Sequence, residues 1–288
     1  MSKERLDVLI TNLGLFGSRE AAKRAIMAGI VLVDNEPIDK PGSKVSLDAA
    51  IRIKGQVMPY VSRGGYKLEQ AIKTFNLDLT GQIIMDIGAS TGGFTDCALQ
   101  NGAVFSYAID VGYNQLAWKL RQDDRVLSME RTNFRHMQPG DLKQGIPTFA
   151  CMDVSFISIK LLLPVVKALL AKEGEVVALI KPQFEAGKDL VGKKGIIRDA
   201  SVHLVVIKEI VAFIRELGFI PLGLTYSPIK GGNASTGKSQ IESESLQVET
   251  LKLGSGNIEF LLHFGNNGVD QVDLAEIEAV VKEAHRVL

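Results

Sequence analysis

The sequence has little cysteine and no hydrophobic run long enough to cross a bilayer. Its 2 cysteines, Cys97 and Cys151, stand among apolar residues and form no spaced set of metal ligands, so we expect small buried side chains and a reducing compartment. The first residues are not followed by the apolar stretch of a secretory signal. The most apolar segment, residues 161–170, is interrupted by a proline and a lysine, as in a helix packed on a sheet. These absences argue against a membrane protein or a metal centre and predict a cytoplasmic chain.

The charges balance over the whole chain but not along it. Its 288 residues contain 33 Lys and Arg and 33 Asp and Glu, and 46% of them are hydrophobic, which fits a globular chain of two domains. Up to Lys67 there are eleven basic residues against seven acidic ones, a net charge of +4 that leaves −4 for the rest. The basic part of the chain therefore comes first.

A glycine-rich turn, residues 86–95, follows the apolar residues 82–85 and leads into an expected helix. Such a turn brings backbone N–H groups and the positive end of a helix dipole close to a ligand, although it also occurs as a purely structural turn. Its glycines are Gly88, Gly92 and Gly93. This spacing does not match the Gly-x-Gly-x-x-Gly of dinucleotide sites and disfavours a nicotinamide dehydrogenase. Asp86 before the turn suits a ligand with an ammonium and no phosphates, such as S-adenosylmethionine (SAM).

Charged residues end three further apolar strands of an alternating strand and helix pattern. Asp110 follows a strand about twenty residues after the turn, where a carboxylate can accept both ribose hydroxyls of an adenosine. Asp153 and Lys181 end the strands that begin at Phe149 and Glu175. If the strands are parallel, these side chains and Asp86 meet at one edge of the sheet, where α/β proteins bind ligands. Each charge alone would equally well mark where a strand reaches water.

The N-terminal part predicts two helices and a small hairpin sheet. Ser18 is a helix cap followed by Arg19, Lys23 and Arg24, which would share one helix face, as they would on a solvated surface helix. Glycine at 29 ends that helix, and strands follow at residues 30–33 and 51–53. We expect a small α+β domain over residues 1–60.

This part resembles the RNA-binding module of the ribosomal protein S-four type over roughly residues 3–60. The residues that carry the resemblance are Arg5-Leu-Asp, Gly14, Ser18-Arg19, Ala22, Gly29, Val31, Val33, Lys40-Pro41 and Val45. It implies that Arg5, Arg19, Lys23 and Arg24 contact RNA phosphates, with little selection of bases.

Four later blocks resemble the FtsJ-related methyltransferases, and the whole chain resembles the TlyA or haemolysin A family. The blocks are residues 62–68, 86–95, 152–158 and 181–185. The resemblance implies an α/β, Rossmann-like class I SAM-dependent methyltransferase sheet over residues 66–288, behind a linker at 61–65. It also implies methylation of a ribose 2′-hydroxyl in ribosomal RNA or ribosomal subunits, at a cytidine of 23S and also 16S rRNA.

The family's catalytic set is Lys-Asp-Lys-Glu, which matches Lys67, Asp153, Lys181 and a late glutamate. Glu259, in the block 256–260 at the start of an expected last strand, is our choice for the glutamate. The chain departs from the family by a polar insertion, residues 233–254, which we expect to be a loop or a short exposed helix. The insertion adds three rival glutamates, namely Glu242, Glu244 and Glu249.

We expect Lys181 to act as the base, held by Asp153 and Glu259, while Lys67 orients the hydroxyl or a phosphate. The residues expected to bind SAM are Asp86, Gly88, Ser90, Gly92, Gly93, Phe94, Asp110, Asn133 and Asp153, with Phe184 as a further lining residue, and Arg63 completes the RNA-binding set. A noncatalytic RNA-binding protein is the alternative function. A pore-forming haemolysin would need an amphipathic or membrane-inserting segment, and the sequence contains none.

Overall fold

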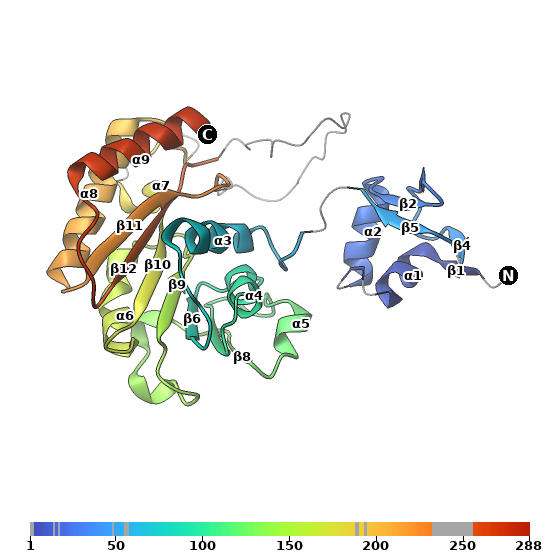
Figure 1. Ribbon diagram of the computed structural model, residues 1–288, viewed down its shortest axis with the longest axis horizontal. Helices are drawn as coiled ribbons and strands as arrows, with labels where there is room; N and C mark the ends of the chain where they lie inside the picture. The colour runs from blue at the N-terminus through green and yellow to red at the C-terminus, as the bar shows by residue number, and fades with distance from the viewer. Residues whose placement is uncertain are drawn as a thin grey trace. The chain divides into compact units, whose positions relative to one another are not determined.

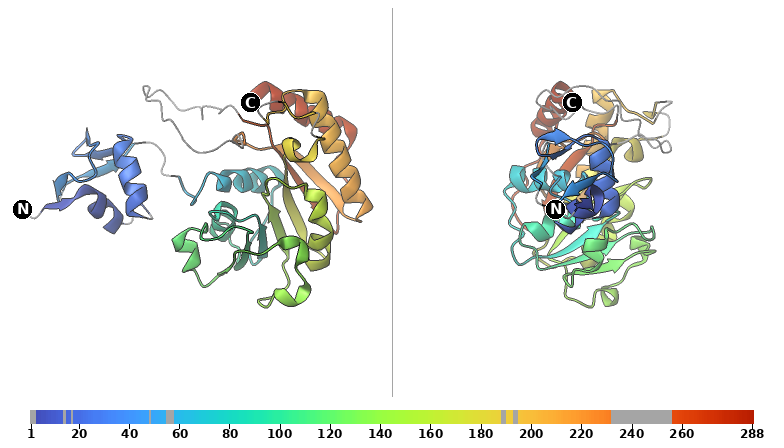
Figure 2. Two further views of the ribbon diagram at one scale, coloured as in Figure 1. Left: turned by 180° about the vertical axis from the view of Figure 1, so that it is seen from behind. Right: turned by 90° about the vertical axis from the view of Figure 1, so that its right-hand side faces the viewer.

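The computed structural model describes residues 3–13, 15–16, 18–47, 49–54, 58–187, 190–192, 195–231 and 256–288. The chain divides into two compact units, Met1–Pro59 and Tyr60–Leu288, and the two are described separately (Figures 1 and 2). Among the described helices, none combines the length and the apolar character that crossing a membrane requires. Cys97 and Cys151 are buried free thiols, as expected.

The first unit is a small α+β domain. Its elements are β1 (Lys3–Arg5), α1 (Leu6–Asn12), α2 (Arg19–Met27), β2 (Val31–Val33), β3 (Glu36–Pro37), β4 (Lys44–Ser46) and β5 (Ile51–Ile53). Ser18 caps α2 by accepting a hydrogen bond from the Ala21 N–H, as its position predicts. Asp34 and Asn35 both have positive φ, which makes the tight turn between β2 and β3. The pairing of β1 with β4 was not predicted from the sequence.

The second unit contains a 7-stranded sheet covered by helices. Its strands are β6 (Ile83–Ile87), β7 (Phe105–Ile109), β8 (Val126–Met129), β9 (Phe149–Met152), β10 (Glu175–Ile180), β11 (Ile220–Tyr226) and β12 (Phe260–Gly265). Its α-helices are α3 (Gly64–Phe75), α4 (Gly93–Gln100), α5 (Trp118–Arg121), α6 (Leu163–Leu169), α7 (Pro182–Glu185), α8 (Ala200–Glu216) and α9 (Leu274–Val287). Short 3₁₀ helices are η1 (Phe134–His136), η2 (Pro139–Asp141) and η3 (Ile159–Leu161).

The strand order is β11-β12-β10-β9-β6-β7-β8. The contacts of β6 with β7 and β9, of β7 with β8, and of β9 with β10 are parallel. The last strand, β12, lies antiparallel between β10 and β11, so the expectation of parallel strands is wrong for this one strand. Because β11 and β10 are each antiparallel to β12, they run in the same direction. Their carboxyl ends therefore lie at the edge where β6, β7 and β9 end.

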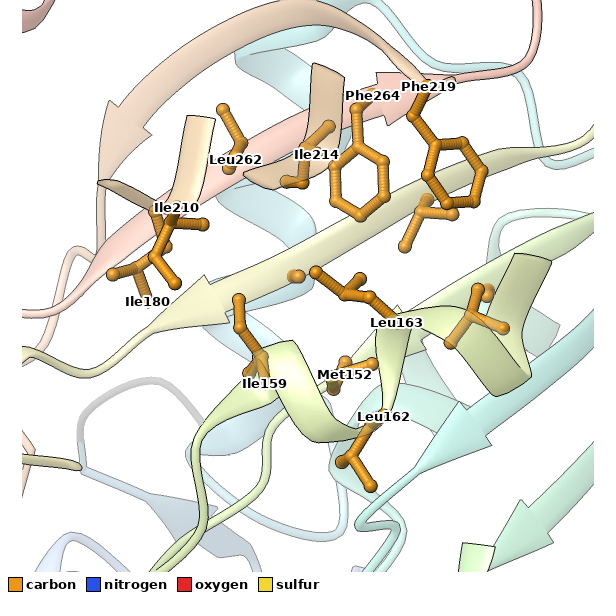
Figure 3. Close-up of a cluster of buried hydrophobic side chains, with 14 of the residues drawn as sticks. Met152, Ile159, Leu162, Leu163, Ile180, Ile210, Ile214, Phe219, Leu262 and Phe264 are labelled. Atoms are coloured by element: carbon orange, nitrogen blue, oxygen red, sulfur yellow. The ribbon is translucent and has the colours of Figure 1, made fainter. Parts of the chain in front are cut away.

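Side chains alternate along each strand and so reach both faces of the sheet. Helices cover each face, so both faces are buried. On one face, α6, α8 and α9 pack on side chains such as Ile180, Leu262 and Phe264, as Figure 3 shows for the centre of the cluster. On the other face, α3, α4 and α5 cover Val177, Leu179 and their neighbours. The result is a three-layer α/β/α domain of the predicted fold class.

Three local features differ from the sequence-based expectation. Helix α3 begins at Gly64, so Gly64 and Gly65 form its first turn rather than part of a joint. Strand β8 and helix α5 were not predicted. The insertion at 233–254, with Glu242, Glu244 and Glu249, lies outside the described residues.

Candidate active site

Charged side chains gather at the carboxyl edge of the sheet, as the alternation of strands and helices predicts. Asp110, Asp153 and Lys181 directly follow β7, β9 and β10. Asp86 lies two residues further inside, as the next-to-last residue of β6. Because these strands are parallel and adjacent, their ends bring the four side chains to one edge.

Two lysines and two carboxylates form a chain of ion pairs at this edge. The Lys67 Nζ lies 3.0 Å from Asp153 Oδ2 and 2.8 Å from Glu259 Oε2. The Lys181 Nζ lies 2.6 Å from Asp153 Oδ1 and 3.0 Å from Ser155 Oγ. Asp153 therefore bridges the two lysines. Glu259 contacts Lys67 rather than Lys181, so the expected arrangement of this carboxylate differs from the observed one.

Lys67 reaches the cluster because α3 packs closely on α4. A Cβ atom at Gly93, in the first turn of α4, would lie 2.3 Å from Ser62 Oγ and 2.8 Å from the Gly65 nitrogen, so the two helices meet through glycines. The Val61 N–H donates to Asp96 in α4 and fixes the approach to α3. This packing points Lys67 at Asp153, and its side chain is only 9% exposed.

Glu259 stands immediately before β12, although the sequence predicts it within the strand. Its backbone carbonyl accepts a hydrogen bond from the Ser227 N–H, and its side chain is 2% exposed. Gly231 and Asn257 form an antiparallel bridge just before it. The Asn257 side chain is bonded on both sides, to the Ile197 N–H and the Gly195 carbonyl. The described residues that flank the inserted segment, Gly231 and Asn257, are thus paired beside Glu259.

The cluster stabilises its own ionised state. Burial alone lowers the pKa of Lys67, but the carboxylates of Asp153 and Glu259 outweigh it and raise that pKa above its usual value. Burial likewise raises the pKa of Asp153, and the two lysines reverse the effect and lower it. Lys67 is therefore the cation held between two carboxylates, whereas Lys181 shares one carboxylate and has a hydroxyl as its second partner.

Asp86 has an unpaired oxygen next to this cluster. Its Oδ2 accepts hydrogen bonds from the Thr95 N–H at 2.9 Å and the Thr95 hydroxyl at 2.7 Å. Its Oδ1 is buried and has no hydrogen-bond partner among the described residues. Burial raises the pKa of Asp86 to about 7, against the effect of the Thr95 bonds. A cationic group placed against Oδ1 would satisfy it, as the ammonium of SAM would.

Two adjoining clefts open at this edge and share Gly88, Ser90, Asp153 and Ser155. One, of about 350 Å³, is lined by Lys67, Asp153 and Lys181 of the cluster and by Asp86, Phe94 and Arg63. The other, of about 410 Å³, is lined by Asp110, Asn133 and apolar side chains. The dimensions and lining suit an adenosine in the second cleft and the amino acid end of SAM in the first. On the observed chemistry, these residues fit the cofactor.

Asp110 fixes the glycine turn. Its Oδ2 accepts the Ser90 N–H at 2.8 Å, and its Oδ1 accepts the Gly112 N–H at 2.6 Å. Ser90 has a φ of 49°, which this bond helps to hold. Asn133 is exposed at the rim and caps η1. The carboxylate stays at the cleft wall with capacity for further hydrogen bonds.

The glycines of the turn also have a packing role that was not expected. A Cβ at Gly88 would lie 2.8 Å from the Asp153 carbonyl oxygen, and one at Gly92 would lie 2.3 Å from the Leu120 side chain. With Gly93, they allow the turn to pack on neighbouring protein, and Gly88 and Gly93 also line the clefts. Gly88 and Gly92 also have positive φ, which favours glycine.

The contacts that some residues of the site make were not predicted from the sequence. Ser155 accepts the Lys181 N–H, and Glu185 accepts the Ser158 hydroxyl and the Ile159 N–H. Phe156 is 76% exposed and its ring lies 5.1 Å from that of Phe184. Their proximity to Asp153 and Lys181 in the sequence is the signal that could have indicated them. Phe184 does not line either cleft but supports Phe156.

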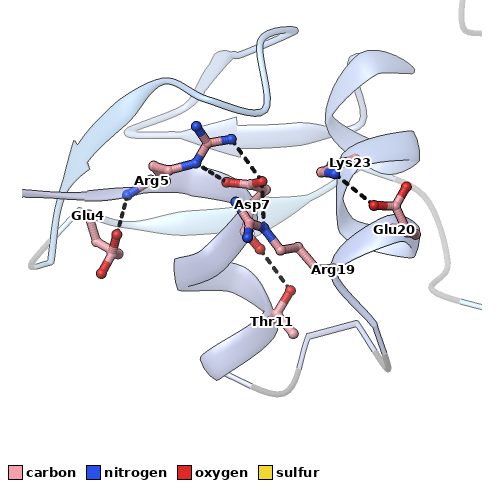
Figure 4. Close-up of polar contacts among 7 residues, drawn as sticks. All are labelled: Glu4, Arg5, Asp7, Thr11, Arg19, Glu20 and Lys23. Carbon is pink, nitrogen blue, oxygen red and sulfur yellow. Dashed lines mark hydrogen bonds and ion pairs between the residues drawn. The ribbon is translucent and has the colours of Figure 1, made fainter. Parts of the chain in front are cut away.

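In the first unit, Arg5 and Arg19 converge on the buried Asp7, as Figure 4 shows. Arg5 binds both Asp7 oxygens, at 3.0 and 3.1 Å, and Arg19 Nε lies 2.9 Å from Oδ2. These bonds, that of Arg5 first, lower the pKa of Asp7 to about 2. Lys23 pairs with Glu20, and Arg24 is exposed. Asp7 therefore holds Arg5 and Arg19 together, and the contact of these four cations with RNA stays a prediction.

Comparisons with known proteins follow the same division. A family described as FtsJ-like methyltransferase matches residues 60–236, and the S4 domain matches residues 4–51. YqxC of Bacillus subtilis is 52% identical over 291 residues, which cover 99% of this chain and 95% of YqxC. TlyA of Mycobacterium tuberculosis, named a 16S/23S rRNA (cytidine-2'-O)-methyltransferase, is 38% identical over 230 residues, which cover 80% of this chain and 85% of TlyA.

A solved structure from Streptococcus thermophilus, whose name includes hemolysin, superposes with a TM-score of 0.71 at 48% identity and covers 100% of this chain and 97% of its own. The resemblance and the fold class predicted from the sequence are thus confirmed. The chain belongs to the TlyA family of FtsJ-like methyltransferases and carries an S4 domain ahead of its methyltransferase domain.

Proposed function

We propose that this methyltransferase uses SAM to methylate a ribose 2′-hydroxyl in ribosomal RNA. The observation that supports it most is the ion-pair chain Lys67–Asp153–Lys181, extended by Glu259, beside a cleft with the dimensions and lining that suit SAM. When bound, SAM supplies a methyl group that is already activated by its sulfonium. The protein must supply alignment and a place for the hydroxyl proton.

The roles follow from the contacts. Lys67, between two carboxylates, stays an ammonium and stabilises the oxygen that develops negative charge or an adjacent phosphate. Lys181 has only one carboxylate partner and is the better candidate to take the hydroxyl proton. Asp153 holds both lysines, and Glu259 acts through Lys67.

The cofactor would be held by groups on both clefts. We assign the ammonium of SAM to Asp86 and its ribose hydroxyls to Asp110, which the unpartnered Asp86 Oδ1 and the lining of the second cleft support. Gly88, Ser90, Gly92, Gly93 and Phe94 form the turn between them, and Asn133 lies at the adenosine end.

The expected partner is ribosomal RNA or a ribosomal subunit. An S4 domain with Arg5 and Arg19 fixed on Asp7 offers guanidinium groups to phosphates, and the exposed Arg24 adds positive charge beside the half-buried Lys23. Arg63 at the rim of the catalytic cleft would contact RNA near the target. A cytidine in 23S and 16S rRNA is the finer proposal, and the name of the Mycobacterium tuberculosis relative supports it.

Transfer of labelled methyl groups from SAM to purified ribosomal subunits tests the proposal. Lys181→Ala should abolish transfer and retain SAM binding in calorimetry, whereas Asp110→Ala should lose SAM binding. Lys208→Ala, an exposed lysine of α8, is the matched control and should keep both. Unmethylated RNA with the wild-type protein would favour the noncatalytic RNA-binding alternative. Mapping ribose methylation in cells with and without the gene identifies the nucleotide.

A further inference from the structure

The Lys181 amine has two partners of different chemistry. Its Nζ lies 2.6 Å from Asp153 Oδ1 and 3.0 Å from the Ser155 hydroxyl oxygen. A neutral lysine amine has two N–H bonds and one lone pair, and the ammonium form has three N–H bonds. The Ser155 hydroxyl accepts a hydrogen bond from this amine, whereas Asp153 Oδ1 lies at ion-pair distance without hydrogen-bond geometry. Lys181 lines the cleft, so a substrate hydroxyl bound there would meet a nitrogen that these two contacts already hold.

Ser155 is the only one of these two acceptors without a charge. It is exposed on the wall that the two clefts share. A hydroxyl can orient an amine without adding a second carboxylate of the kind that makes Lys67 a persistent cation. Ser155 thus gives Lys181 a neutral acceptor, whereas Glu259 gives Lys67 a second negative charge.

The loop that carries Ser155 is fixed at both ends. At its start, the Asp153 N–H donates to the Ile87 carbonyl of β6. At its end, Glu185 accepts the Ser158 hydroxyl at 2.6 Å and the Ile159 N–H at 2.9 Å. Glu185 follows Lys181 by one turn of chain, so the segment that carries the lysine also holds the loop that carries its acceptor.

Between these ends the backbone is constrained. Phe156, next to Ser155, has a φ of 66°, a left-handed conformation that costs free energy for a residue with a side chain. Its ring packs against Phe184, which precedes Glu185. The strain and the aromatic contact indicate that the position of Ser155 is set by the fold and is not a free loop conformation.

We propose that Ser155 is a positioning residue, which together with Asp153 orients the Lys181 nitrogen toward the substrate hydroxyl. This role rests on the proposed function. Ser155 forms no bond to the reacting atoms, since the proton passes from the ribose oxygen to Lys181.

Single-turnover methyl transfer to ribosomal subunits, at saturating SAM and over a range of pH, tests this role. Ser155→Ala should lower the rate on the order of tenfold to a hundredfold. Its SAM dissociation constant should change less than about threefold, because binding is assigned to other groups. The rising limb of the rate against pH should move to lower pH, since a lost acceptor no longer stabilises the ammonium. Ser155→Thr, which restores a hydroxyl, should recover most of the rate.

Ser158→Ala is the comparison variant within the loop, because it removes the anchor to Glu185 and keeps the Ser155 hydroxyl. It should move the pH dependence less than Ser155→Ala does. Three results overturn the positioning role while the function stands. The Ser155→Ala enzyme keeps its rate, or it loses only SAM affinity, or its rate–pH curve moves no further than that of Ser158→Ala. A wild-type protein that methylates neither subunit refutes the function itself and this role with it.

Discussion

Replacing Lys67 by methionine should separate the stability of the ion-pair cluster from its activity. Lys67 is the only described cation within ion-pair distance of Glu259, whose side chain is 2% exposed. Breaking a buried pair by removing one partner costs about 3 to 5 kcal/mol, because the other charge is left uncompensated. Asp153 is less affected, since it keeps Lys181. We therefore expect Lys67→Met to lower the free energy of unfolding by that amount, chiefly through Glu259.

The double variant Lys67→Met/Glu259→Gln removes both charges and leaves the Lys181–Asp153 pair. It should recover at least about 2 kcal/mol relative to the sum of the single variants. Urea unfolding followed by circular dichroism measures these differences. Lys73→Met is the control on the same helix, because its pair with Glu69 is exposed and should be worth less than about 1 kcal/mol.

Methyl transfer should be absent from Lys67→Met and from the double variant alike. Stability that returns while activity does not would show that the lysine has a role beyond compensating Glu259. Additive losses in the double variant, with no coupling between the two positions, would refute the reasoning about the buried pair.

Four further predictions concern packing and protonation. Gly93→Ala should destabilise the second unit by about 1 to 3 kcal/mol, because its Cβ would press on α3, whereas Gly140→Ala, with nothing within 4 Å, should leave the melting temperature unchanged. The pKa of Asp86 is raised to about 7, so its contribution to stability should fall as pH rises from about 4 through 7. SAM binding at pH 6 should release protons because it favours the ionised carboxylate, and calorimetry in buffers of different ionisation enthalpy measures the release. The pKa of Asp7 is lowered to about 2, so its contribution to the stability of the first unit is present above about pH 4 and is lost as pH falls toward 2. Amide NMR signals of the first unit should report this loss in the wild type but not in Asp7→Asn.

The edge of the sheet could be predicted because it depends on local patterns. Apolar runs that end in Asp110, Asp153 and Lys181 need only a parallel arrangement to bring these residues together. The same is true of the Ser18 cap and the turn at Asp34, where one side chain or one dihedral decides the conformation.

Pairings between distant segments could not be predicted in this way. The contact of Lys67 with Glu259 depends on an antiparallel strand that enters between β10 and β11, and no local pattern specifies that position. The convergence of Arg5 and Arg19 on Asp7 likewise depends on how α1 and α2 pack. The packing role of Gly93 required the coordinates of α3.

The place of β12 in the sheet has a consequence for biosynthesis. Lys67 meets Glu259 across 192 residues of sequence, so a translating ribosome must finish most of the polypeptide before the pair can form. Contacts of such separation also close slowly once the chain is available. A nascent molecule consequently emerges without a working catalytic centre and gains it as one of the last steps of maturation.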